Sequence, residues 1–527
     1  MIYHCEDHTC NYWDEGEKLP ERCPQCGRKL LRANEADMTG DDWTALGNTL
    51  WDAEASDKKR MVDCFRKAAY LGSAWGVCNL GICMEQGNGV EADPVQAFWL
   101  YQQAVEMGSL NAVCCLGVCY QYGIGTAPDA KQAAELYCKA AEYGSPRGQM
   151  LLARAFHDGI GVEADAAEAV HWVRAAAYQR YGEGMHRLGE CYAYGDGVEQ
   201  NWEHAVHWFR EAAESGVSTA MTDLGYCYEK GCGVEQSWEQ AFSWYRRGAE
   251  CGYPVSMSNL GLCYKRGYGV DQNWQEAIKW YEQGAQCGDL QSMHNLACCY
   301  EHGEGVEQNM TEAIRWYTAA AEGGNADDMY ELGWQYDHGE GVEQDMKKAI
   351  CWYERAAEQN HPAAMNSLGE CYAMGRGVPR DLETAMEWYR RAAELGEAMA
   401  DYNMGWHLEQ AGKLSEAYAH YRKAADGNDD SAWWALGRFY ENGVVVAQDG
   451  KEARRCYETG EKLGSVKCKM RLARCKLLGI GGRREKKAGL DLCRQALELA
   501  KESSEKEDYG YEAEMNLLRR TIAENES

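Results

Sequence analysis

The sequence has no apolar run long enough to cross a bilayer, and its first ten residues, MIYHCEDHTC, contain no hydrophobic stretch typical of secretory signals. Positive charge is also scarce, since 54 Lys and Arg stand against 83 Asp and Glu, a net charge of −29. An acidic surface repels phosphate backbones and anionic lipid, which disfavours nucleic acid and membranes as partners. It favours a protein or peptide with a basic segment, although the same charge would also simply keep a large protein soluble.

Matched cysteine pairs are missing as well. The 25 cysteines include eight that recur at one position of a repeated pattern, with no second column at a constant spacing from them. An odd total without matched pairs argues against a secreted disulfide protein and predicts a reducing, cytoplasmic location. At the repeated position we expect cysteine to act as a small buried apolar residue on a helix. The eight are Cys83, Cys119, Cys191, Cys227, Cys263, Cys299, Cys371 and Cys475.

A 36-residue repeat organises most of the chain. The pair Leu188-Gly189 returns with Leu at positions 224, 260, 332 and 368, and position 296 carries Leu followed by Ala. Followed in both directions, this position occurs thirteen times between Leu46 and Leu472. A fixed period of this length predicts a stacked-repeat protein, in which each unit contacts only its neighbours.

Each repeat is predicted to contain two helices. The first, such as residues 219–230, ends at a glycine suited to the left-handed conformation, and a Gly-x-Gly-Val turn follows. The second begins at a column of residues that are all favoured N-caps and carries an alanine column, which lets helices approach closely, and an aromatic pair such as Trp244-Tyr245. The N-cap column is Asp93, Asp129, Asp165, Asn201, Ser237, Asn273, Asn309, Asp345, Asp381 and Asp449.

The pattern A-x3-L-G-x2-Y-x2-G-x-G-V-x2-[DN]-x3-A-x2-W-Y-x2-A-A-E-x-G resembles the Sel-1-like repeat, a relative of the tetratricopeptide repeat, over nearly all of residues 42–500. The resemblance implies an all-α protein, an α/α solenoid with a right-handed superhelix, which serves as an adaptor for protein complexes. The unit at Met404 lacks the Gly-x-Gly-Val turn, so we expect a local change in pitch there. After a charged gap at 501–508, residues 509–523 are predicted to form a helix that caps the stack within the 501–527 tail.

Two close cysteine pairs occupy residues 1–31, namely Cys5-x4-Cys10 and Cys23-x2-Cys26. Four such sulfurs can close a tetrahedral site for which zinc is the usual ion, and a site with four protein ligands is structural rather than catalytic. The second pair, in Cys-Pro-x-Cys-Gly, resembles zinc-ribbon and rubredoxin-like knuckles. Two alternatives stay open: His8 replaces a cysteine as ligand, or iron replaces zinc. Residues 32–41 are predicted to form a polar linker before the solenoid.

A partner-binding surface is predicted on the first helices, which line the concave face in related repeats. Its informative positions precede the repeated Leu or follow the repeated Gly, because they vary from unit to unit. Asparagine at the first position resembles the residues by which tetratricopeptide domains hold a ligand's backbone, and large aromatics are typical anchors. We expect an extended or helical peptide near residues 223–406, although each side chain alone could simply face solvent. The candidates are Asn259, Asn295, Asn403, Tyr226, Trp334 and Trp406.

An adaptor without catalytic activity is therefore the leading prediction. Ser56-x-x-Lys59 and Ser503-x-x-Lys506 match the S-x-x-K motif of β-lactamases. This match needs attention because a secreted, cysteine-rich branch of the Sel-1-like repeat family is associated with β-lactam binding and hydrolysis. Neither K-T-G nor S-D-N accompanies them, so a hydrolase is the weakest alternative. The other alternative is a zinc ribbon that docks on nucleic acid or a nucleoprotein complex, which the acidic balance of residues 1–31 disfavours.

Overall fold

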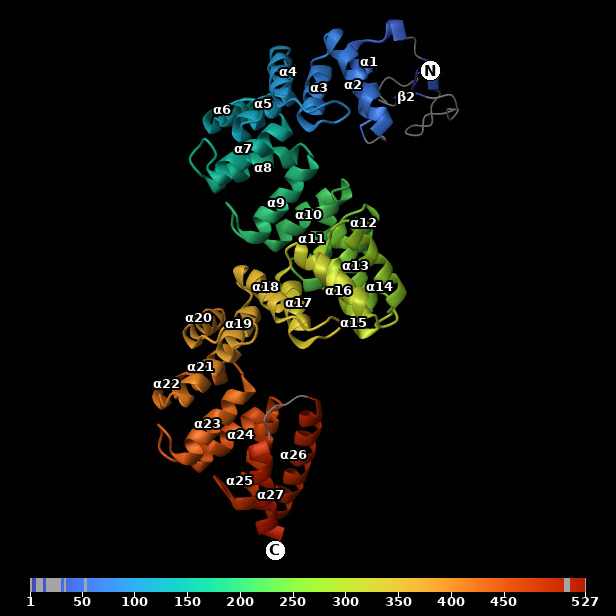
Figure 1. Cartoon of the computed structure of the whole chain (residues 1–527). Coiled ribbons are helices and arrows are strands. Elements are labelled where there is room, and N and C mark those ends of the chain that lie inside the picture. The colour runs from blue at the N-terminus through green and yellow to red at the C-terminus, as the bar shows by residue number, and fades with distance from the viewer. Residues whose placement is uncertain are drawn as a thin grey trace. The chain divides into compact units, whose positions relative to one another are not determined.

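The computed structural model describes residues 2–5, 13–15, 30–32, 35–51, 55–506 and 512–526, and helices dominate it (Figure 1). The chain divides into two compact units, Met1–Trp280 and Tyr281–Ser527, which are described separately. The boundary falls inside α14 (Trp274–Gln286). Within the described ranges, no helix has both the length and the hydrophobicity that crossing a membrane requires.

A small antiparallel sheet of order β2-β1-β3 opens the first unit. Its central strand β1 (Ile2–Cys5) pairs with β2 (Trp13–Glu15) and with β3 (Leu30–Arg32). Of the four predicted zinc ligands, Cys5 is the last residue of β1, whereas Cys10, Cys23 and Cys26 lie outside the described residues, as does His8. The zinc site therefore stays a prediction.

Helices then follow in succession (Figure 1), and α1 to α26 form thirteen pairs of a first and a second helix. This confirms the predicted all-α solenoid with its number of repeats. After the short η1 (Glu35–Asp37), the first unit contains α1 (Gly40–Thr49), α2 (Ala55–Tyr70), α3 (Ala74–Gln86), α4 (Pro94–Glu106), α5 (Leu110–Tyr122), α6 (Ala130–Glu142), α7 (Pro146–Asp158), α8 (Ala166–Tyr178), α9 (Gly182–Tyr194), α10 (Trp202–Glu214), α11 (Ser218–Lys230), α12 (Trp238–Glu250) and α13 (Pro254–Arg266). The second contains α15 (Leu290–His302), α16 (Met310–Glu322), α17 (Ala326–His338), α18 (Met346–Glu358), α19 (Pro362–Met374), α20 (Leu382–Glu394), α21 (Ala398–Gln410), α22 (Leu414–Asp426), α23 (Asp430–Asn442), α24 (Gly450–Lys462), α25 (Val466–Leu478), α26 (Lys486–Lys506) and α27 (Glu512–Glu526).

Inside a repeat, the glycine of the Leu-Gly pair packs against the tyrosine of the Trp-Tyr pair. A Cβ atom on Gly225 of α11 would lie 2.6 Å from the ring of Tyr245 on α12, so only glycine leaves room for that ring. The tyrosine is 1% exposed, and its hydroxyl donates a hydrogen bond of 2.8 Å to Glu229. This bond satisfies the hydroxyl group that the packing buries.

The Gly-x-Gly turn joins one repeat to the repeat before it. Gly231, with φ +74°, caps α11 in the left-handed conformation, as the sequence predicted. Gly233, with φ +69°, approaches the preceding repeat so closely that a Cβ atom would lie 2.3 Å from the carbonyl oxygen of Trp202. Its lack of a side chain therefore allows the two backbones to touch.

The N-cap and cysteine columns are confirmed. Oδ1 of Asn201, for example, accepts a hydrogen bond of 3.0 Å from the backbone N–H of His204 in the first turn of α10. All eight cysteines of the repeated position are at most 2% exposed, and they are thiols. Cysteine thus fills the space of a small apolar side chain between helices.

The structure corrects two boundaries in the predicted repeat array. Helix α1 begins at Gly40, inside the predicted linker, because Thr39 and Asp42 form a capping box. Helix α26 continues to Lys506, so most of the predicted charged gap is helical; its lysines and glutamates are good helix formers. Near Met404, only residues 411–413 connect α21 to α22, as expected from the missing Gly-x-Gly-Val turn.

Candidate peptide-binding groove

A groove with a volume of about 600 Å³ lies in the second unit, along the first helices of three consecutive repeats, α17, α19 and α21. Three of the six predicted partner-binding residues line it, namely Trp334, Asn403 and Trp406. Trp334 and Trp406 occupy the same position two repeats apart, and Glu370 occupies that position in the repeat between them. The groove therefore places an acidic residue between two large aromatic residues along the stack.

Neighbouring rings position the two tryptophans. The ring of Trp334 stacks on His338 at a centroid distance of 4.3 Å, and the ring of Trp406 stands edge-on to His407 at 4.7 Å. Trp406 is 38% exposed, which leaves ring surface for a ligand. Met399, also in the lining, is exposed, and its flexible thioether adapts to ligands of different shapes.

A hydrogen-bonded network holds Glu370 in the middle of the groove. Asn403 Nδ2 donates to Asn366 Oδ1 at 3.0 Å and to Glu370 Oε1 at 3.2 Å, and Asn366 Nδ2 donates to the same carboxylate oxygen at 3.2 Å. The amide donors of Asn403 are thus directed at protein groups. The pKa of Glu370 is raised, because the effect of burial exceeds the opposing effects of the bond from Asn403 and of the charge of Arg376.

Negative charge prevails in this lining. Its carboxylates are those of Asp337, Glu370 and Glu397, and its one guanidinium is that of Arg376, a net formal charge of −2 with neutral histidines. Arg376 lies 2.8 Å from Asp337 and 3.8 Å from Glu370. Burial lowers the pKa of His407, so this imidazole adds no positive charge at neutral pH. The groove therefore offers a favourable place for a cationic side chain.

The other three predicted residues lie elsewhere. Tyr226 and Asn259 belong to α11 and α13 of the first unit, where Lys230 Nζ lies 5.8 Å from the ring centre of Tyr226. Asn295 is half-buried on α15 of the second unit, outside the lining of the groove. The lining of the groove comes from residues 330–407, which overlap the C-terminal part of the surface predicted near residues 223–406.

Sequence reasoning missed a further column of lining residues, two places before the repeated Leu. It comprises Tyr330, Asn366 and Tyr402. Each precedes by four residues a member of the column Trp334, Glu370 and Trp406, and residues four apart share one face of a helix. In the sequence, the same 36-residue spacing marks these side chains.

Twelve segments of the chain match the family model of the Sel1 repeat. The chain belongs to the Sel1 repeat family. The matched residues are 76–109, 112–145, 146–181, 182–217, 218–253, 254–289, 290–325, 326–361, 362–397, 398–429, 432–465 and 466–501. Helices α1 and α2 precede the first matched segment and complete the thirteen pairs. Sel1 repeat proteins are generally protein–protein interaction modules rather than enzymes, which agrees with the coarse function predicted from the sequence.

Two proteins of solved structure are similar to this chain. The c5321 protein, a protective antigen of uropathogenic Escherichia coli strains with an SLR fold, is 29% identical over 81% of this chain and 94% of its own, with a TM-score of 0.56. A Sel1 repeat protein from Oxalobacter formigenes is 31% identical over 46% of this chain and 96% of its own, with a TM-score of 0.42. No curated protein matches the chain.

Proposed function

We propose that this Sel1 repeat protein is a scaffold that binds a peptide segment of a partner protein in the groove of its second unit. The observation that carries the proposal is the convergence of Trp334, Glu370 and Trp406, from three consecutive repeats, in one groove. Apolar side chains of the ligand would contact the two tryptophans, which are typical anchors in binding sites. A lysine or arginine between them would face Glu370.

Glu370 can accept such a cation without leaving a guanidinium unpaired. Arg376 is its ion-pair partner in this structure, but the shorter contact of Arg376, at 2.8 Å, is with Asp337. A ligand cation that displaces Arg376 from Glu370 leaves the pair with Asp337 intact. The selectivity for a basic segment therefore follows from charges that are already in place before binding.

The test is a selection of short random peptides, displayed on phage, against the full-length protein. We expect the selected peptides to combine Lys or Arg with apolar residues, and to bind Trp334→Ala and Trp406→Ala at least about tenfold more weakly, as for anchor residues. Trp99→Ala is the matched control, because Trp99 is 64% exposed on α4 of the first unit, outside this groove. Equal binding to all three variants would refute the groove as the site.

We also propose a cytoplasmic location and a function without catalysis. The buried thiols of the cysteine column support the first proposal, because a reducing compartment keeps them in that form. The repeat architecture supports the second, because neighbouring helix pairs create an extended docking surface.

A further inference from the structure

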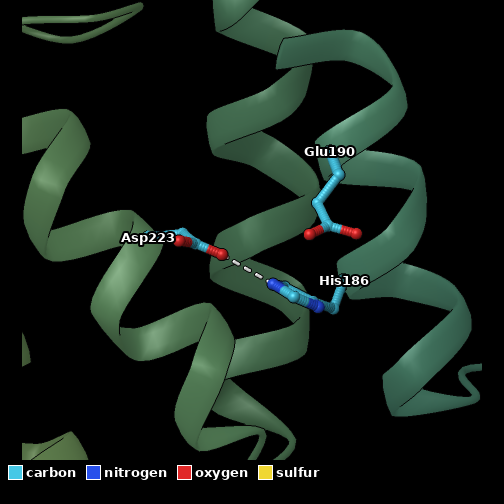
Figure 2. Close-up of side chains that lie close together, drawn as sticks. All are labelled: His186, Glu190 and Asp223. Atoms are coloured by element: carbon cyan, nitrogen blue, oxygen red, sulfur yellow. Dashed lines mark hydrogen bonds and ion pairs between the residues drawn. The ribbon is translucent and has the colours of Figure 1, made fainter. Parts of the chain in front are cut away.

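Three side chains that can ligate a metal converge in the first unit, which does not contain the groove described above. His186 and Glu190 lie four residues apart on α9, and Asp223 lies on α11, the first helix of the next repeat. Figure 2 shows the His186 ring and the Glu190 carboxylate extending from one helix toward Asp223 on the facing helix. One ligand atom from each of the three lies within 4.8 Å of the other two. We propose that this cluster binds a divalent transition-metal ion such as Zn²⁺.

The donor set suits such an ion. It consists of one imidazole nitrogen and two carboxylate oxygens. Zinc binds both kinds of ligand atom, whereas Mg²⁺ and Ca²⁺ prefer oxygen ligands alone, so the imidazole favours zinc. Around a tetrahedral ion with bonds of about 2.0–2.1 Å, neighbouring ligand atoms are roughly 3.3 Å apart. His186 Nε2 and Asp223 Oδ2 are 2.6 Å apart, so small side-chain rotations would place an ion among the three groups.

The surroundings already position the imidazole. The His186 side chain is only 16% exposed, and its ring lies 5.8 Å from that of Phe209 on α10, centre to centre. Glu190 and Asp223 are more accessible, with 30% and 41% of their side chains exposed. An ion could therefore enter from solvent and find a ligand whose ring is held by packing.

The charges nearby permit an ion to bind. Arg187 competes for Glu190, with a nitrogen 3.3 Å from Oε2, but it also lies 2.9 Å from Asp196. Glu190 can thus turn to the ion while Arg187 keeps its contact with Asp196. Counting Arg187, Glu190, Asp196 and Asp223, with His186 neutral, the local formal charge is −2, which favours a divalent cation.

Three protein ligands leave at least one coordination position for water or for a group of a bound partner. The ion would also link the first helices of two consecutive repeats. Because it binds only the folded arrangement, it should stabilise the first unit against unfolding.

The experiment measures binding of Zn²⁺ and Co²⁺ to the full-length protein by calorimetry and absorption. Glu190→Gln, Asp223→Asn and His186→Ala should each lose about tenfold or more in affinity for one ion per chain. His207→Ala, an exposed histidine on the intervening α10, should bind as the unchanged protein does. Zn²⁺ should raise the unfolding temperature of the unchanged protein and of His207→Ala. The increase should be smaller for Glu190→Gln.

Cobalt separates this site from any cysteine-bound metal, because an imidazole–carboxylate site gives no thiolate-to-cobalt charge-transfer band. Glu190→Gln should therefore bind less Co²⁺ than the unchanged protein, while the thiolate charge-transfer band keeps its intensity. Glu190→Gln keeps the size of the side chain, so its result stands even if His186→Ala does not fold. Equal affinity and equal stabilisation in Glu190→Gln and in the unchanged protein would overturn the proposal.

Discussion

His294 Nδ1 lies 2.7 Å from Asp328 Oδ1, and this contact joins the first helices of two consecutive repeats, α15 and α17. The Asp328 side chain has no exposed surface, and that of His294 is 27% exposed. The bond to Asp328, and then the contact with Cys298, raise the pKa of His294 to about 10. The imidazole of His294 is therefore charged at neutral pH and faces the buried side chain of Asp328, whose own pKa burial raises.

This pair should make stability depend on pH in the alkaline range. The folded-state pKa of His294 is above the unfolded value of about 6.5, so its contribution is complete below that pH and disappears as the pH rises through about 10. We compare the free energy of unfolding of the unchanged protein with that of His294→Gln. The difference between them should be ~1–2 kcal/mol larger at neutral pH than above pH 10. Urea unfolding over this range measures the difference.

Cys298 requires a control in that experiment, because its Sγ lies 3.5 Å from His294 Nε2 and its contact contributes to the raised pKa of that imidazole. Cys298→Ser removes the thiol and should keep the pH dependence. A gap between the unchanged protein and His294→Gln that stays constant with pH would contradict the raised pKa.

Arg376→Ala should destabilise the second unit. The Asp337 side chain is 5% exposed, so removal of Arg376 leaves a buried carboxylate whose remaining contact is the Tyr353 hydroxyl at 3.5 Å. Because Arg376 itself is 39% exposed, solvent screens part of the interaction, and we expect a loss of roughly 1–3 kcal/mol in the free energy of unfolding. Urea unfolding measures it, and Arg376→Ala combined with Asp337→Asn should recover part of the loss.

Arg390→Ala is the matched control for that loss. Arg390 pairs with Glu387 on the surface of α20, with more than half of both side chains exposed. Its removal should change stability by less than ~0.5 kcal/mol. Similar effects for Arg376→Ala and Arg390→Ala would show that Asp337 does not depend on its cation.

Two glycines with similar backbone angles should respond differently to alanine. Gly233→Ala places a Cβ atom 2.3 Å from a backbone oxygen of the preceding repeat, whereas Gly252, with φ +84°, has open space around that position. We expect Gly233→Ala to cost roughly 3 kcal/mol or more, and Gly252→Ala about 1 kcal/mol for the left-handed backbone alone. Thermal and urea unfolding of both variants decide whether the turn joins the repeats as described.

Natural variation along the chain agrees with the smaller effect expected at Gly252. The position of Gly252 is occupied in other repeats by Arg180 and Asn360, both with positive φ. The position of Gly233 admits Val445, with φ +65°, in the repeat that directly follows the short connection at 411–413. An equal loss of stability for the two alanine variants would refute the close approach at Gly233.

The periodic features could be predicted from the sequence because each depends on a residue's place within one repeat. The helix pairs, the caps at residues such as Asn201 and the buried cysteines are of this kind. The groove was predicted in part, because Trp334 and Trp406 share a repeat position. The role of Arg376 could not be predicted. Its partner Asp337 precedes it by 39 residues, and their contact depends on how the turn of one repeat packs on the preceding repeat. The His186–Asp223 contact likewise crosses repeats, at a spacing of 37 residues.

The predicted zinc site of residues 1–31 has a direct test in the full-length protein. A segment of about thirty residues cannot build a sufficient core, so a metal should hold it together. Cys23→Ser and Cys26→Ser should each remove one zinc ion per chain, measured by elemental analysis, whereas Cys251→Ser, an exposed thiol after α12, should not. Cobalt loaded into the unchanged protein should show a thiolate charge-transfer band that Cys26→Ser weakens and Glu190→Gln retains.

The same spectra distinguish the two alternatives for the ligand set and the ion. If Cys10 is a ligand, Cys10→Ser weakens the thiolate band and His8→Ala leaves it unchanged; if His8 takes that place, the effects are reversed, because each missing ligand changes the field at the metal. Iron in an all-sulfur site would be found by elemental analysis in place of zinc. Full zinc content in Cys23→Ser and Cys26→Ser would show that these cysteines do not hold the ion.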